Sequence, residues 1–297
     1  MRKVNYLNNK DLLLEIHKSK STFSSFVDES YNQFDIILLS VDKINIRTIA
    51  EAKRNKVKRL SRDAYATRKA AGEKVKQADC EVDYKSITKE EIIFRVMTYD
   101  HIPEEPGRKK TPKTVADTKS KVNFPPFKQF VISNLEKKEV REVTRSHWKG
   151  SLSNGKFCTT HGRITNVLGT MFLKLVERYS HRANWRGYTY VDEMRGQALV
   201  QLSQVGLQFN ESKSDNPFAY YTAAVNNSFT RVLNLEKRNQ NIRDDILIDQ
   251  GHLPSYSRQT AHEDQIKRAR ANSEWDWDNY NATGPRAALN GITSQEE

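Results

Sequence analysis

The sequence lacks the features that mark several large classes of protein. It has only two cysteines, Cys80 and Cys158, which excludes a disulfide framework. No stretch approaches the roughly 18 apolar residues that a membrane-spanning helix needs, and the opening residues lack the apolar run of a signal peptide. We therefore expect a cytosolic protein that contacts no membrane and begins with a structural helix.

The common motifs of catalysis are missing too. The chain has no P-loop, no HExxH motif, no nucleophile elbow and no glycine-rich dinucleotide fingerprint. Cys158 and His161 are spaced like half of a zinc site, with His147 upstream, but no second pair of ligands follows at a recognisable spacing. We predict no catalytic residue, no metal and no cofactor.

Acidic residues are outnumbered by basic ones. The 297 residues include 49 Lys and Arg against 37 Asp and Glu, which gives a net charge of +12. This balance favours a polyanionic partner, nucleic acid before an anionic membrane surface. Two basic clusters, Lys53–Arg62 and Arg108–Lys121, could neutralise phosphates. The alternative is that each is a solvated face, or that the second is a disordered arm.

The first half of the chain divides by pattern. Residues 1–20 predict a helix capped by Asn8 or Asn9. Residues 21–155 form a basic segment of α+β or irregular structure. Within this segment, the patterns predict strands in 34–46 and 90–102, one or two helices in 47–77, and a linker rich in proline and lysine near 103–126.

The second half is more regular. Residues 156–245 predict three helices, of which the first has the strongest apolar period, from Ile164 to Tyr179. A capping box of Thr189 and Asp192 predicts the start of the second helix. Asn216 and Pro217 predict the start of the third. Its buried side would carry the apolar residues Phe218, Tyr221, Val225, Phe229 and Val232. The fold class is mainly α, with a flexible tail over 246–297.

The stretch "WRGYTYVDEMRGQALVQLSQVGLQFNESKSDNPFAYYTAAVNNSFTRVLNLEKRN" resembles the second conserved region of bacterial sigma factors. It is most similar to the divergent late-transcription sigma factors of T-even-type bacteriophages, and "NYLNNKDLL" near the start resembles the opening of that family. Residues 20–155 have no counterpart in the short phage sigma factor. Ala223 and Ala224 stand where housekeeping sigma factors carry a tryptophan pair.

The resemblance implies a use for the polar face of the third helix. Asn226 and Asn227 would read the promoter element nearest the start site, and Tyr220 would hold the non-template strand open. Asparagine suits adenine, arginine suits guanine or phosphate, and tyrosine can stack on an unpaired base. The full set of predicted DNA contacts is Tyr220, Tyr221, Asn226, Asn227, Thr230, Arg231, Asn234, Lys237 and Arg238.

The resemblance also implies two protein contacts. The start of the second helix would bind the host core polymerase through Asp192, Glu193, an exposed Met194, Arg195 and Gln197. Trp275 and Trp277 in the acidic tail are candidate anchors for the phage sliding clamp, because short motifs bind by burying aromatic residues. A phage coactivator is a further candidate partner.

These features predict a phage-encoded sigma factor that acts in the host cytoplasm. It would bind the host RNA polymerase core and recognise and help open an A·T-rich late promoter, without bond chemistry of its own. Two alternatives remain. One is a DNA-processing enzyme of the HNH-like nuclease kind, with a metal held by residues between His147 and His161. The other is a general nucleic-acid-binding protein.

Overall fold

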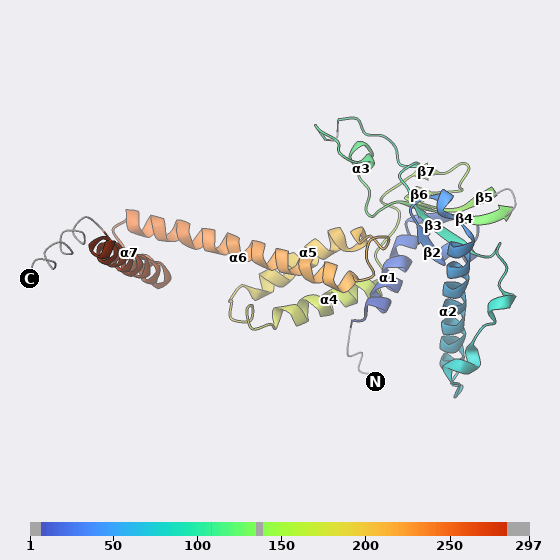
Figure 1. Ribbon diagram of the computed structural model, residues 1–297, viewed down its shortest axis with the longest axis horizontal. Helices are drawn as coiled ribbons and strands as arrows, with labels where there is room; N and C mark the ends of the chain where they lie inside the picture. The colour runs from blue at the N-terminus through green and yellow to red at the C-terminus, as the bar shows by residue number, and fades with distance from the viewer. Residues whose placement is uncertain (1–6, 108, 135–138, 284–297) are drawn as a thin grey trace, which may run out of the picture. The chain divides into compact units, whose positions relative to one another are not determined.

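The computed structural model describes residues 7–107, 109–134 and 139–283, with side chains in the last stretch up to Asn272. The chain is mostly helical and has a small sheet, which confirms the expected mainly α class (Figure 1). Two compact units, Met1–Phe229 and Thr230–Glu297, divide inside helix α6 (Pro217–Asp249). The sheet and the first helices therefore belong to one unit, whereas the sequence pattern placed boundaries at 155 and 245.

Local sequence signals explain most helix starts in the first unit. Its helices before α6 are α1 (Asn9–Ser21), α2 (Ile46–Ala70), the short α3 (Val115–Thr118), α4 (Asn166–Ser180) and α5 (Val191–Val205). The predicted cap of α1 is confirmed, because the Asn8 side chain accepts a hydrogen bond from the Lys10 amide. The predicted capping box of α5 is wrong. Tyr190 occupies the N-cap and makes no side-chain cap there, so Thr189 and Asp192 do not begin the helix in that way.

A five-stranded sheet occupies most of the segment between α1 and α4. Its strands are β1 (Ser24–Phe26), β2 (Ile36–Leu38), β3 (Ile93–Met97), β4 (Phe127–Asn134) and β5 (Glu139–Ser146), in the order β1-β5-β4-β3-β2. Only β2 and β3 run parallel. These two are the strands that the sequence predicts. A separate hairpin pairs β6 (Trp148–Lys149) with β7 (Lys156–Phe157).

The two faces of the sheet are covered differently. Helix α2 packs against one face, where Ile49 and Ala52 meet strand residues in a core that consists of Leu38, Ile49, Ala52, Ile92, Phe94, Val96 and Ile132 (Figure 1). On the other face, a smaller cluster of Ile93, Val131 and Val143 is covered by Tyr31 and Phe34. The α+β character expected for the basic segment is therefore present.

Helix α4, the loop between α4 and α5, and the start of α6 share an aromatic core. The Phe172 and Tyr221 rings lie 4.9 Å apart in an edge-to-face arrangement, and Phe229 lies 5.3 Å from Tyr179 and 5.4 Å from Trp185. Such pairs add to the free energy gained by burying the rings. The apolar period of α4 predicts most of its buried side chains, namely Leu168, Phe172, Leu175, Val176 and Tyr179.

The segment expected as a linker near 103–126 folds back on itself. Glu104 and Lys119 form an isolated β-bridge and an ion pair at 3.0 Å. Lys109 pairs with Asp117, and Phe124 is buried at the end of the segment. Most of the second basic cluster is thus part of an ordered loop rather than a disordered arm.

The sequence predicts a flexible tail over 246–297; the described part of that range is mostly helical, and residues 284–297 lie outside the described residues. Helix α6 continues to Asp249, and α7 (Tyr256–Thr283) follows a turn at Gly251, whose φ of 78° suits glycine. Ser255 donates from its amide and its hydroxyl to the buried Asp244 carboxylate, at 2.9 and 2.7 Å. Arg258 pairs with Asp245 at 2.6 Å. These contacts fix the start of α7 against the end of α6.

Candidate nucleic-acid interface

The start of α6 is fixed by its own sequence and by α1. The Asn216 side chain accepts a hydrogen bond from the Ala219 amide at 3.0 Å, and Pro217 is the first helical residue, as predicted. The Phe218 amide donates to Asn9 Oδ1 at 3.1 Å. These two hydrogen bonds fix the direction of the first turn of α6 relative to α1.

A buried ion pair holds the loop that precedes α6. Lys20 Nζ on α1 donates to Glu211 Oε1 at 2.7 Å and to the Phe209 carbonyl at 2.8 Å, with the two charged side chains only 1% and 5% exposed. Burial lowers the pKa of Lys20 to about 8. Burial alone would raise the pKa of Glu211, but Lys20 and His17 hold it well below its usual value. The sequence gives no signal for this pair, whose members lie far apart along the chain.

Arg95 of β3 extends the buried cluster into the sheet. Its guanidinium carbon lies 3.8 Å from the centre of the Phe34 ring and 3.9 Å from that of Phe127. Burial lowers the pKa of Arg95 to about 9, and the nearby Glu211 carboxylate opposes this shift. His17 Nδ1 lies 3.5 Å from Arg95 Nη1 and 3.4 Å from Glu211 Oε1. With its amide turned to satisfy its neighbours, Gln129 accepts from Arg95 Nη2 at 2.9 Å. One network thus joins α1, the sheet and the loop before α6.

The inward face of α6 contains one of the predicted DNA contacts. Tyr221, Val225 and Phe229 are fully buried. The Tyr221 hydroxyl donates to the Gly206 carbonyl at 2.5 Å, and burial raises its pKa. The prediction that Tyr221 contacts DNA is therefore wrong, because its ring belongs to the core. Phe218, expected to be buried, is instead 37% exposed.

The outward face of α6 in the first unit carries three more of the predicted residues. Tyr220 is half-buried, its hydroxyl donates to the Val205 carbonyl at 3.3 Å, and burial raises its pKa. Asn226 and Asn227 are exposed. Asn226 Oδ1 accepts from the Tyr179 hydroxyl at 2.6 Å, whereas the Asn227 side chain makes no hydrogen bond within the described part of the chain. Asn227 is thus the residue of this face whose amide is fully available.

The remaining predicted DNA contacts lie in the second unit. Arg231, Asn234, Lys237 and Arg238 are exposed on α6, and Thr230 is half-buried. No ion pair joins these cations to a carboxylate among the described residues. Their charges are therefore available to a phosphate backbone.

At the start of α5, every residue predicted to contact the polymerase is at least partly exposed except Met194. Asp192 and Glu193 are exposed, and Arg195 and Gln197 are half-buried. Arg195 pairs with Asp192 at 2.9 Å and donates to Ser180 Oγ at 2.8 Å. Met194 is fully buried, so the expectation of an exposed methionine is wrong.

The candidate clamp anchors cannot be placed in the same way. Trp275 and Trp277 are residues of α7, and the structure describes their backbone but not their side chains. Their role stays a prediction.

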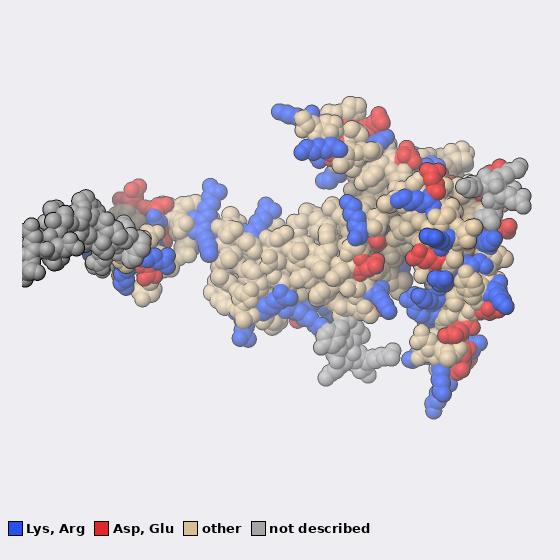
Figure 2. Space-filling model, viewed as in Figure 1, with Lys and Arg blue, Asp and Glu red and all other residues tan. Residues whose placement is uncertain are grey.

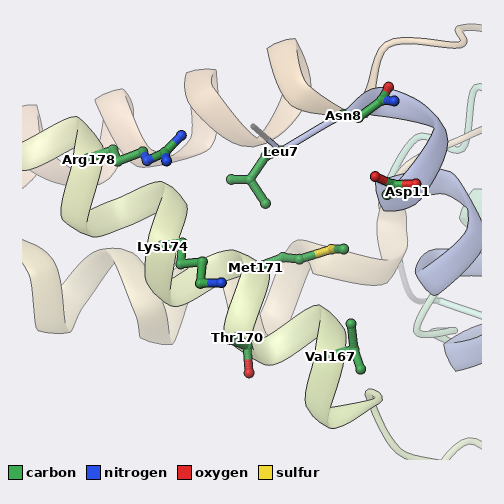
Figure 3. A pocket seen from close by; sticks show the side chains of 8 residues that line it. All are labelled: Leu7, Asn8, Asp11, Val167, Thr170, Met171, Lys174 and Arg178. Carbon is green, nitrogen blue, oxygen red and sulfur yellow. The ribbon is translucent and has the colours of Figure 1, made fainter. Parts of the chain in front are cut away.

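A groove that sequence reasoning missed runs along α4. It has a volume of about 340 Å³. Leu7, Val167 and Met171 supply its apolar wall, and Lys174 and Arg178 of α4 lie along its length (Figure 3). None of the predicted site residues lines it.

The histidines near the hairpin do not form a ligand set. Among the described residues, no three His, Cys, Asp or Glu side chains are grouped to hold a metal. His147 is fully buried, its ring stacks 4.0 Å from that of Phe124, and burial lowers its pKa to about 3. His161 Nδ1 lies 3.1 Å from the Cys158 carbonyl oxygen.

Within the described residues, none of the helices has the length and apolar character to span a bilayer. Comparison of the chain with protein-family models, with curated proteins and with solved structures gives no match.

Proposed function

We propose that the chain is a phage-encoded specificity subunit of RNA polymerase, which acts in the host cytoplasm with the host core enzyme. The start of α5, with the exposed Asp192 and Glu193 and the half-buried Arg195, would contact the core. The exposed face of α6 would recognise an A·T-rich late promoter. The chain would perform no bond chemistry itself.

One observation carries this proposal. Within the segment that resembles sigma factors, α6 buries Tyr221 and Phe229 completely and leaves Asn227 exposed with a free amide. An asparagine side chain can form two hydrogen bonds with adenine in the major groove, which is worth about 1–3 kcal/mol of discrimination. Lys237 and Arg238, exposed further along α6, suit phosphate contacts that position the helix.

The proposal includes a limited role in strand opening. Ala223 and Ala224 offer no aromatic wedge, and Tyr220 is half-buried with its hydroxyl engaged. We therefore propose that α6 recognises the promoter while opening depends on the core polymerase or on a phage coactivator. The sliding clamp is a further proposed partner, through Trp275 and Trp277.

The test is a pull-down with host core polymerase followed by run-off transcription on a phage late promoter. Asn227→Ala should leave core binding unchanged and lower promoter-specific transcription roughly 10-fold, which corresponds to the loss of one bidentate base contact. Gln204→Ala removes an exposed amide from α5 and serves as the matched control.

Three results would contradict the proposal. The first is no binding of the core by the wild-type chain at moderate salt. The second is an equal effect of Asn227→Ala and Gln204→Ala on run-off transcription. The third is a uniform loss of affinity for all DNA sequences in Asn227→Ala, which would indicate a general nucleic-acid-binding protein.

A further inference from the structure

Three of the nine cations of helix α2 are engaged with other parts of the fold, and one of these, Lys53, has its Nζ 5.3 Å from the centre of the Tyr84 ring. Lys56 and Arg59 face the sheet, where Lys56 pairs with Glu91 at 3.3 Å and Arg59 pairs with Asp35 at 2.7 Å. Lys56 also donates to the Glu91 carbonyl at 2.6 Å. These two cations are used in holding α2 on the sheet.

Five of the other six cations lie on the opposite side of the helix, and the sixth, Arg68, is exposed beside them. Five exposed or outward-facing cations recur at intervals of seven or four residues: Arg47, Arg54, Lys58, Arg62 and Lys69. With 3.6 residues per turn, this spacing keeps them in one narrow row, which we call the α2 cationic stripe. No member of the stripe is in an ion pair with another described residue, and Glu51 is the one acidic residue in the row. Figure 2 shows lysine and arginine side chains over the region of α2 and the sheet.

The composition of the stripe indicates its partner. A protein interface needs a desolvated aromatic or apolar centre, and a membrane-surface helix needs an exposed apolar face. On α2, Ile49 and Ala52 are instead buried against the sheet, and the one large apolar side chain that is strongly exposed on this helix, Ile46, lies at its first residue rather than at its centre. A row of cations without an apolar centre suits a regular row of phosphates.

Length and aromatic content favour duplex DNA over a single strand. At 1.5 Å per residue the stripe spans about 33 Å, close to one turn of B-form DNA. Binding of a single strand depends on aromatic platforms for the bases. The stripe has only Tyr65, whose ring lies 5.0 Å from Lys69 Nζ and whose hydroxyl accepts a hydrogen bond from it at 3.0 Å.

We propose that the α2 cationic stripe binds the phosphate backbone of duplex DNA without regard to sequence. The stripe belongs to the segment that has no counterpart in the short phage sigma factor. The stripe would give the chain a second DNA contact besides the face of α6. The role of this contact at a promoter rests on the proposed function. Each phosphate that the stripe neutralises releases condensed counterions, so the contact has a measurable salt dependence.

The experiment uses the full chain and a promoter-free DNA duplex longer than one helical turn. Affinity is measured by fluorescence anisotropy between about 50 and 200 mM salt, and the logarithm of the association constant is plotted against the logarithm of salt concentration. The test variant is the triple substitution Arg54→Gln, Lys58→Gln and Arg62→Gln. The matched control removes three exposed lysines of the same unit: Lys74→Gln, Lys85→Gln and Lys89→Gln. Thermal melting by circular dichroism checks that both triple variants are folded.

The stripe variant should reduce the steepness of the salt dependence by about three, roughly one per lost phosphate contact, and the control by less than one. Equal changes in the two variants would overturn the proposal, because they would show an effect of net charge alone. The same measurement on a single-stranded RNA of equal length gives a second test. If the triple substitution in the stripe weakens binding of the RNA more than binding of the duplex, the proposal is also overturned.

Core-polymerase pull-down separates this proposal from the previous one. An unchanged salt dependence in the stripe variant, with core binding and transcription intact, would remove the stripe proposal and leave the sigma-factor proposal standing. Failure of the stripe proposal appears in the DNA-binding measurement, and failure of the sigma-factor proposal appears as a wild-type chain that does not bind polymerase. The two failures are therefore distinguishable.

Discussion

The buried pair of Lys20 and Glu211 provides the sharpest test of how the first unit holds together. Replacement of Glu211 by Gln keeps the shape of the side chain and removes its negative charge. Lys20 is then left with the Phe209 carbonyl, at 2.8 Å, as its remaining hydrogen-bond acceptor, and the positive Arg95 lies in the same cluster. Removal of one partner of a buried pair costs about 3–5 kcal/mol, because the other charge stays buried without compensation.

That loss is large against the about 5–15 kcal/mol by which a typical domain is stable. The comparison variant is Glu104→Gln, because Glu104 also pairs with a lysine at 3.0 Å but its side chain is 73% exposed. Exposed pairs contribute about 0–1 kcal/mol. Urea unfolding at pH 7, followed by far-ultraviolet circular dichroism, should therefore show a difference of at least about 2 kcal/mol between the two variants.

The pH dependence gives a second reading of the same substitution. The pKa of Lys20 in the folded wild-type chain is already lowered to about 8 by burial, below its value in the unfolded chain. Loss of Glu211 lowers the pKa of Lys20 in the folded chain further. At a pH between this folded-state pKa and the pKa of Lys20 in the unfolded chain, the unfolded chain binds the proton and the folded chain does not. Stability then rises with pH, and the deficit of Glu211→Gln relative to wild type should shrink between pH 7 and pH 9.

A double substitution completes the cycle. Lys20→Met together with Glu211→Gln removes both charges and should recover at least about 2 kcal/mol relative to Glu211→Gln alone. Additive losses from the two single substitutions would refute the reasoning, as would a cost of Glu211→Gln no larger than that of Glu104→Gln.

Two further predictions concern His147 and the glycines of the first unit. Burial lowers the pKa of His147 to about 3, so below pH 6.5 the unfolded chain binds a proton that the folded chain does not, and stability should fall by about 1.4 kcal/mol per pH unit from this group. His147→Asn, which tolerates the φ of 52° at this position, should flatten a plot of unfolding free energy against pH by that amount, and an unchanged slope would contradict the assignment. Gly162→Ala should destabilise the fold by about 1–3 kcal/mol, because the new Cβ would overlap the Phe23 ring. Gly196→Ala in α5 meets open space and should stabilise it by about 0.5–1 kcal/mol. A melting temperature that rises in Gly162→Ala or falls in Gly196→Ala would count against the packing described.

Local signals predicted the parts of the fold that depend on neighbouring residues. The cap at Asn8 and the Asn216–Pro217 start of α6 are set by hydrogen bonds within a few residues, so the sequence pattern was sufficient. The start of α5 was misjudged because Tyr190 takes the N-cap without a side-chain bond, although Thr189 and Asp192 have the spacing of a capping box. Helix α5 therefore begins without a side-chain cap, and the sequence spacing of a capping box does not by itself place a helix start.

Long-range pairing was beyond the reach of those signals. Strands β4 and β5 form the longest pair in the sheet, and their partners are set by tertiary contacts rather than by an apolar alternation that a single sequence displays. Lys20 lies in a lysine-rich helix end that indicates a solvated position, yet its partner Glu211 is 191 residues away. Periodicity predicted that Tyr221 faces the core, and the family resemblance predicted that it contacts DNA; burial decides between them.

The buried cluster bears on how the basic segment, residues 21–155, relates to the helices on either side of it. Arg95 enters the cluster from β3 and lies between Phe34 and Phe127, both from the same segment. Lys20 also lies 5.5 Å from the centre of the Phe124 ring. A chain without residues 21–155 would keep Lys20 and Glu211 but would lose the rings of Phe34, Phe124 and Phe127, which lie against this cluster. Because Glu211 belongs to the loop that leads into α6, the sheet contributes to the placement of that helix, and the segment is part of the folding unit rather than a detachable module.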